Sequence, residues 1–269
     1  MKGAGSRPPA RTAALGGVLA AVLAGCGGQT GTLTGDASDP ALTAVAGDTS
    51  APALTVMPST PSSARPVPGA VTGRVTGSVL PVSCSADPNA GDGFVGTGFR
   101  TKHGVVTASH VVGACPSGTT ISFGYGYGTV SIDDPAHDLA VVDQSGVYPN
   151  PDTDLSPKPL QLEPKPAFAG QGLALLGIPA LPSLGSPFKR PVTVVPGTVV
   201  ATHHAQLLTS AQGARRTLQD TLAVAVPGPA HGQRGGPAVD SAGKVVGVIV
   251  GGVSGIATLT PATHLKSVQ

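Results

Sequence analysis

The sequence contains no tryptophan, and aromatic residues make up only 3 % of its 269 residues. Charged residues are scarce as well, at 11 % against about 25 % in typical soluble proteins. The scarcity of charge argues against a coiled coil or a long helical bundle, because such folds are rich in charged residues. The formal net charge is only +2, and Lys2, Arg7 and Arg11 near the N-terminus supply this excess. The remainder lacks the basic balance that nucleic-acid binding requires, so we expect no nucleic-acid partner.

Residues 1–25 have the pattern of an export signal, with basic residues followed by an apolar run over residues 13–25. As a helix this run rises about 20 Å, which is too short to cross a hydrocarbon core of about 30 Å. The run ends in Leu23-Ala24-Gly25-Cys26, which resembles the lipobox of bacterial lipoproteins. The resemblance implies that Cys26 is acylated and anchors the exported protein to the extracytoplasmic face of the cell membrane. A plain secretory signal with an incidental cysteine is the alternative.

Residues 26–76 are expected to form the lipidated Cys26 followed by a disordered tether. The segment is dominated by Gly, Thr, Ala, Ser, Pro and Asp, and it has no aromatic residue. Such a composition buries too little apolar area to offset the entropy lost on ordering. We therefore expect a spacer that holds a domain off the membrane, with a partly ordered arm as the alternative.

Residues 77–269 are expected to form the folded domain, because short Val-rich runs alternate there with Gly and Pro. This pattern is typical of an all-β sandwich or barrel, and two small barrels fit the length. Only Pro261–Val268, with Thr260 as its N-cap, looks helical. The apolar runs are Phe94–Phe99, Val105–Ala108, Thr119–Phe123, Thr129–Ile132, Leu139–Val142, Gly172–Gly177, Val192–Val200, Leu222–Val226, Pro237–Val239, Val245–Val250 and Ile256–Leu259.

Three local motifs follow one another within this domain. They are Thr107-Ala108-Ser109-His110 after Gly96-Thr97-Gly98-Phe99, then Asp138-Leu139-Ala140, then Gly232-Gln233-Arg234-Gly235-Gly236-Pro237. Their types and order over residues 94–268 resemble the chymotrypsin-like serine proteases, and most of all the secreted trypsin-like peptidases of bacteria. The resemblance implies an all-β fold of two six-stranded antiparallel barrels with a short C-terminal helix.

The resemblance also implies roles for individual residues. His110 matches the general base, and Asp138 matches the acid that orients it, with Asp133, Asp134 and Asp143 as rival acids. Gly232 and the backbone amide of Arg234 match the oxyanion hole, which stabilises negative charge on the substrate carbonyl.

The third motif departs from the family at the nucleophile. The family has a serine where this chain has Arg234, and a guanidinium stays protonated and cannot attack a carbonyl. Ser241 and Ser254 lie too far along the chain to replace it without rebuilding the loop. We expect Arg234 to reach Asp138 and form an ion pair there.

Cys84 and Cys115 are an even pair in an exported domain, and the resemblance implies a disulfide that braces the loop carrying His110. Two buried thiols are the alternative. We expect no metal and no cofactor, since the chain has no zinc motif and adjacent strand residues such as His203 and His204 face opposite sides. Arg215 and Arg216 are expected to be solvated loop charges.

These observations favour a monomeric cell-envelope lipoprotein with a trypsin-like protease fold that is catalytically inactive. A peptide or protein is its expected ligand, and small or apolar side chains are favoured because Gly228 stands where trypsin-type enzymes carry a pocket acid. An active serine endopeptidase with a non-standard nucleophile is the alternative. A display scaffold with a filled groove is a third interpretation, because fold alone does not define function.

The lipobox can be tested by the change Cys26→Ser, which removes the only thiol in that motif. We expect the variant to leave the membrane fraction, because no other predicted segment is long enough to hold it there. Membrane fractionation followed by immunoblotting measures this, and persistence of the variant in the membrane fraction would contradict the prediction.

Overall fold

The computed structural model describes residues 66–84, 94–147, 157–179, 191–209, 215–227, 233–253 and 255–266. The predicted leader, Cys26, Gly232 and Ser254 lie outside these residues. Within the described ranges, no helix has the length and apolar character needed to span a membrane.

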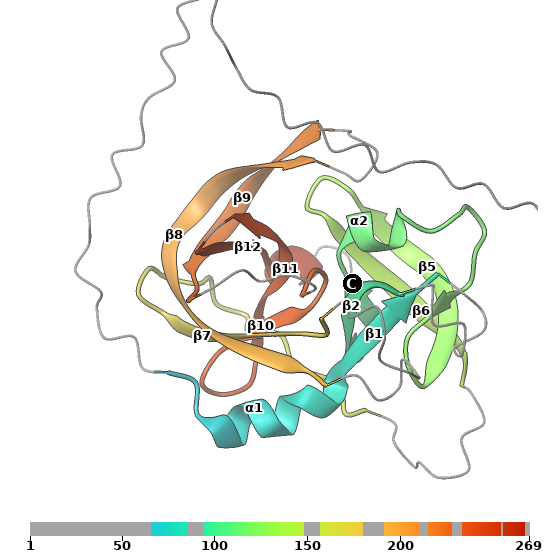
Figure 1. The fold of residues 1–269 in the computed structure, drawn as a ribbon, viewed down its shortest axis with the longest axis horizontal. Helices are drawn as coiled ribbons and strands as arrows, with labels where there is room; N and C mark the ends of the chain where they lie inside the picture. The colour runs from blue at the N-terminus through green and yellow to red at the C-terminus, as the bar shows by residue number, and fades with distance from the viewer. Residues whose placement is uncertain are drawn as a thin grey trace, which may run out of the picture. The chain divides into compact units, whose positions relative to one another are not determined.

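The first barrel is built from six antiparallel strands (Figure 1). The order is β1-β2-β3-β6-β5-β4, and pairing of Ser83 with Ser122 closes it. Its interior is apolar and includes Val82, Val105 and Phe123. The strands are β1 (Val79–Ser83), β2 (Phe94–Thr101), β3 (Gly104–Thr107), β4 (Ile121–Ser122), β5 (Gly126–Asp134) and β6 (Leu139–Val147).

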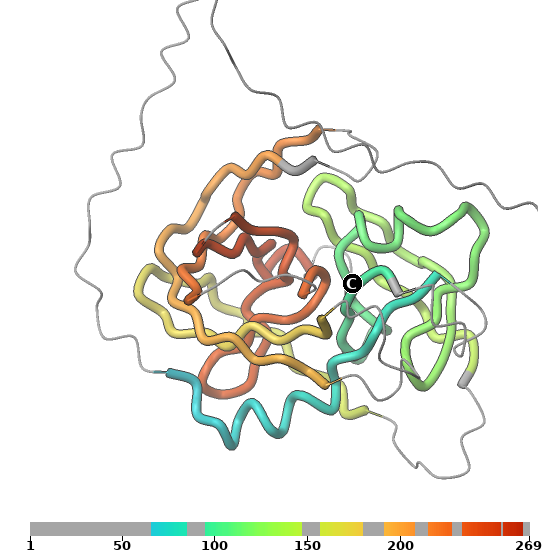
Figure 2. Tube along the Cα trace, in the orientation of Figure 1, coloured from blue at the N-terminus to red at the C-terminus, as the bar shows by residue number. Residues whose placement is uncertain are grey.

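The second barrel repeats this architecture in the C-terminal half of the domain, as the colour order in Figure 2 shows. Its order is β10-β11-β12-β9-β8-β7, and pairing of Ala238 with Leu175 closes it. The predicted all-β fold of two six-stranded barrels is therefore confirmed. The strands are β7 (Gly172–Gly177), β8 (Thr193–Thr209), β9 (Arg215–Ala225), β10 (Pro237–Val239), β11 (Val245–Val253) and β12 (Ile256–Pro261).

Alternation along the strands explains how the two barrels pack against each other. Successive strand residues face opposite sides, so one face can fill a barrel while the other meets the neighbouring barrel. On β3, Val105 belongs to the core of the first barrel, whereas Val106 belongs to a cluster that also contains Leu176 and Val248 of the second. A buried apolar cluster therefore holds the barrels together.

A helix precedes the first strand, inside the segment predicted to be a disordered tether. It is α1 (Gly69–Val75), and the 3-10 helix η1 (Thr76–Ser78) continues it. Val71 and Val75 lie one turn apart on one face, and both are buried. Val75 joins the cluster between the barrels. Regular structure is therefore present before residue 77, because these two valines pack on an apolar surface that composition alone does not reveal.

The C-terminal helix begins later than predicted. Strand β12 runs to Pro261, which pairs with Gly247, and among the described residues of this segment, which end at residue 266, His264–Lys266 forms the 3-10 helix η3. Thr260 is not an N-cap, since its hydroxyl donates to the carbonyl oxygen of His137 at 2.6 Å. Pairing with β11 outweighs the local helix signal at this end of the chain.

The predicted disulfide is confirmed. Cys84 follows β1, Cys115 follows helix α2 (Ser109–Val112), and their Cα atoms are 5.2 Å apart in the bridge. It therefore ties the helix that carries His110 to the end of β1.

We expect Cys84→Ser to lower the free energy of unfolding by roughly 3 kcal/mol, because the bridge closes a loop with a sequence separation of 31. Thermal unfolding under oxidising conditions measures this. The double change Cys84→Ser/Cys115→Ser is the control, since it should match the single variant. An unchanged Tm in both variants would contradict the prediction.

Candidate active site

The structure brings His110 and Asp138 together from two neighbouring strands of the first barrel. His110 lies on α2, directly after β3, and Asp138 precedes β6, the strand paired with β3. The ring Nδ1 of His110 is 2.6 Å from Asp138 Oδ2, and the His110 amide donates to Oδ1 at 2.9 Å. The Asp138 carbonyl also accepts the Ser109 amide at 3.1 Å. One residue thus fixes both the ring and the backbone of His110.

The rival acids lie elsewhere. Asp133 and Asp143 are exposed on the first barrel, and Asp134 pairs with His137 at 2.7 Å. The side chain of Asp138 is fully buried, so its negative charge depends on the hydrogen bonds from His110 for compensation.

The second ring nitrogen of His110 has no comparable contact. Because Nδ1 faces the carboxylate of Asp138, the proton of the neutral ring lies on Nδ1 and leaves Nε2 as an acceptor. Nε2 is buried and has no hydrogen-bond partner in the described part of the chain. In a working triad a serine hydroxyl donates to this atom.

The predicted ion pair between Arg234 and Asp138 is wrong. Arg234 is exposed and makes no ion pair with any described residue. Arg216, from β9 of the second barrel, occupies Asp138 Oδ1 instead. The prediction that Arg216 is a solvated charge is therefore also wrong, whereas Arg215 beside it is exposed.

The register of β9 explains why Arg216 reaches the first barrel. Leu218, two residues further along, lies on the same face of the strand as Arg216. Leu218 is 1 % exposed and belongs to the buried cluster that fills the first barrel. Burial of Leu218 therefore points the side chain of Arg216 toward the first barrel as well, where it meets Asp138.

The loop that carries Arg234 keeps a tightly fixed backbone. The Arg234 carbonyl accepts the Thr97 amide at 2.9 Å, and the Gly235 amide donates to Ile249 at 2.7 Å. Gly235 has a φ of +84°, and a Cβ there would overlap the Thr97 carbonyl oxygen, so only glycine fits. The amide of Arg234 donates to no backbone carbonyl of the described residues. Gly232, its predicted partner in the oxyanion hole, lies outside them.

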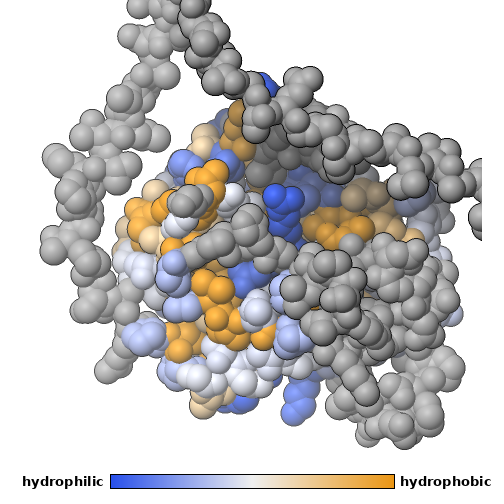
Figure 3. All heavy atoms as spheres, in the orientation of Figure 1, coloured by the Kyte–Doolittle hydropathy of each residue, from blue (hydrophilic) through white to orange (hydrophobic). Residues whose placement is uncertain are grey.

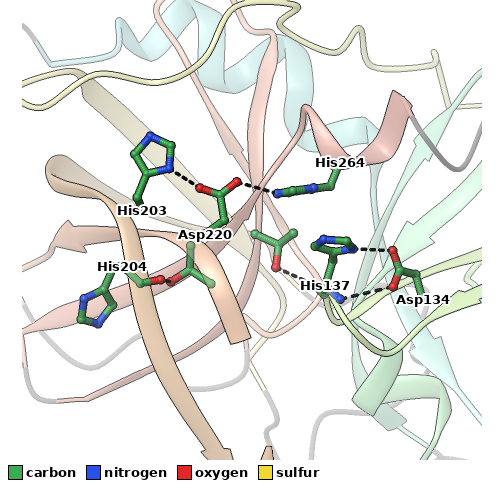
Figure 4. Close-up of polar contacts among 8 residues, drawn as sticks. Asp134, His137, His203, His204, Asp220 and His264 are labelled. Atoms are coloured by element: carbon green, nitrogen blue, oxygen red, sulfur yellow. Dashed lines mark hydrogen bonds and ion pairs between the residues drawn. The ribbon is translucent and has the colours of Figure 1, made fainter. Parts of the chain in front are cut away.

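A row of histidine and aspartate side chains includes His137, the residue directly before Asp138 (Figure 4). The rings of His137 and His264 stack with centroids 4.0 Å apart, joining the β5–β6 turn to the C-terminal 3-10 helix. Asp220 contacts His264 Nε2 at 3.1 Å and also pairs with His203. Sequence reasoning missed this row, because its members come from four separate segments.

Among the histidine and aspartate side chains of this row, Asp134 has a pKa that is shifted from its ordinary value. Burial raises the pKa of Asp134, but the hydrogen bonds and charge of His137 outweigh it and hold the pKa below its ordinary value. Within the described residues, no group of three or more His, Cys, Asp or Glu side chains is arranged to hold a metal ion.

Comparison with known proteins now decides the family. The trypsin-like peptidase domain family matches residues 96–248, which is more than half of the chain. The chain belongs to the trypsin-like peptidase family. The family match covers both His110 and Asp138, together with the loop around Arg234.

Solved structures agree with this fold. The active form of the Rv3671c protease from M. tuberculosis is 22 % identical, with a TM-score of 0.56 over 76 % of this chain and 86 % of that one. The HtrA-type protease AlgW with a decapeptide is 18 % identical, with a TM-score of 0.53 over 74 % of this chain and 65 % of that one. No curated protein sequence matches the chain.

We expect Arg216→Ala to lower the free energy of unfolding by about 2–3 kcal/mol, because it removes a charged partner from the buried carboxylate of Asp138. Urea unfolding measures the change. Arg215→Ala is the matched control and should stay within about 0.5 kcal/mol, since Arg215 is exposed. Equal stabilities for the two variants would contradict the prediction.

Proposed function

We propose that the protein is a cell-envelope lipoprotein whose trypsin-like domain is catalytically inactive and binds a peptide or protein. The observation that carries the proposal is Arg234 at the position of the nucleophile. The hydrogen bonds of its carbonyl to Thr97 and of Gly235 to Ile249 hold the loop in place. A loop that is retained while its nucleophile is replaced suits a fold used for binding.

The surroundings of His110 support inactivity. The described residues supply no hydroxyl or thiol to Nε2, which is the atom that would activate a nucleophile. Ser241 is exposed in the turn after β10, and the Asp240 side chain organises the backbone of that turn. Ser241 therefore lies beyond β10, the strand that follows the Arg234 loop.

The contact of Arg216 with Asp138 also supports inactivity. Catalysis by a triad needs the carboxylate to stabilise the imidazolium that forms on the histidine. A guanidinium on the same carboxylate offsets that negative charge and competes for it. The arginines at positions 234 and 216 thus oppose the same chemistry.

The proposed location in the cell envelope rests on the N-terminal leader. Residues 1–25 and Cys26 have the pattern of a lipoprotein signal, and a disulfide between Cys84 and Cys115 suits an exported protein.

An active endopeptidase with a non-standard nucleophile is the second candidate. The 2.6 Å contact between His110 Nδ1 and Asp138 favours it, because this is the orientation that a general base requires.

The experiment compares the natural full-length chain with Arg234→Ser, using fluorophosphonate labelling and casein hydrolysis. We expect the natural chain to show neither labelling nor casein hydrolysis. We expect Arg234→Ser to gain labelling, because the new hydroxyl then lies in the fixed loop. The control Arg234→Ser/His110→Ala should lose that labelling. Labelling or casein cleavage by the natural chain would overturn the proposal and favour the second candidate.

A further inference from the structure

The site holds two arginines with different surroundings. Arg216 matches the single negative charge of the buried Asp138 carboxylate, whereas the exposed guanidinium of Arg234 has no carboxylate partner among the described side chains. In Figure 3, strongly hydrophilic atoms lie between an apolar area over the second barrel and another over the first. The guanidinium of Arg234 leaves a positive charge without a described counter-ion at this loop, and such a charge attracts anions.

The loop of Arg234 and the helix of His110 both approach Gly96 of β2. A Cβ at Gly96 would lie 2.8 Å from the side chain of Val111, which follows His110, and 3.1 Å from the Arg234 carbonyl oxygen. The amide of Thr97 binds that same carbonyl. The loop of Arg234 and the helix of His110 thus meet on either side of one residue of β2.

Three groups in this place lack a partner within the described part of the chain. They are the Arg234 guanidinium, the Arg234 amide and His110 Nε2. The first two are donors, whereas Nε2 is an acceptor in the neutral ring, because Nδ1 faces Asp138. A group with two acceptor oxygens and a negative charge would satisfy the two donors of Arg234 together.

We propose that this site binds a peptide carboxylate, with Arg234 as its main contact; this inference rests on the proposed peptide-binding function. Guanidinium groups bind carboxylates through two parallel hydrogen bonds, which gives both strength and direction. In an active relative of this fold the same place receives the carbonyl that a serine attacks. Arginine at position 234 replaces attack on a carbonyl by recognition of a carboxylate.

The carboxylate can come from the C-terminus of a peptide or from an Asp or Glu side chain. Both offer the same two oxygens, so the probes must separate them. We use fluorescein-labelled hexapeptides that end in Ala or Val, prepared as free acids, as C-terminal carboxamides, and as carboxamides with an internal Glu.

Binding to the full-length chain is measured by fluorescence polarisation. We expect the free acids to bind about tenfold tighter than the plain carboxamides. Arg234→Gln should remove this difference, and Arg215→Gln, which removes an exposed charge from β9, should leave it intact. Both variants should fold normally by circular dichroism, because both positions are exposed.

The remaining outcomes are distinct. Tight binding of the carboxamides with internal Glu, lost in Arg234→Gln, supports the site and identifies a side-chain carboxylate as the ligand. Equal binding of all three pools would overturn the carboxylate inference while leaving peptide binding intact. Failure of every pool to bind would overturn both the inference and the proposed binding of such peptides.

Discussion

The charge of Asp138 is the constraint on which this site depends. A fully buried carboxylate is costly unless charged or polar groups compensate it, and here the compensation comes from both barrels. His110 contributes from the first barrel through its ring and its amide, and Arg216 contributes from the second. The carboxylate therefore links the two halves of the domain electrostatically at the same place where a triad would act.

Apolar packing makes this electrostatic link possible. The cluster around Val106, Leu176 and Val248 fixes how the barrels meet, and Leu218 fixes the face that β9 presents to the first barrel. Arg216 then reaches Asp138 because its position in the strand repeats that of Leu218. A change of one residue in the register of β9 would turn Arg216 away, so the ion pair depends on strand pairing as well as on charge.

The sequence predicts what is local and misses what depends on register. Short apolar runs indicated eleven of the twelve described strands, all except β1, and the resemblance to the chymotrypsin-like proteases paired Asp138 with His110. The contact of Arg216 with Asp138 was not predicted, because it spans 78 residues and depends on the pairing of β8 with β9. Helix α1 was not predicted for a similar reason, since its two valines pack on an apolar surface that other segments of the chain form.

Under the proposed inactive function, the two arginines also explain why a serine at position 234 alone would not restore efficient catalysis. That serine would supply a hydroxyl, but Arg216 would still take one oxygen of Asp138 and offset its charge. Full general-base catalysis needs that charge to stabilise the imidazolium that forms on His110. Release of Arg216 would free the charge but would also remove a partner from a buried carboxylate. The ion pair with Arg216 therefore stabilises the buried carboxylate of Asp138 but opposes its use in general-base catalysis.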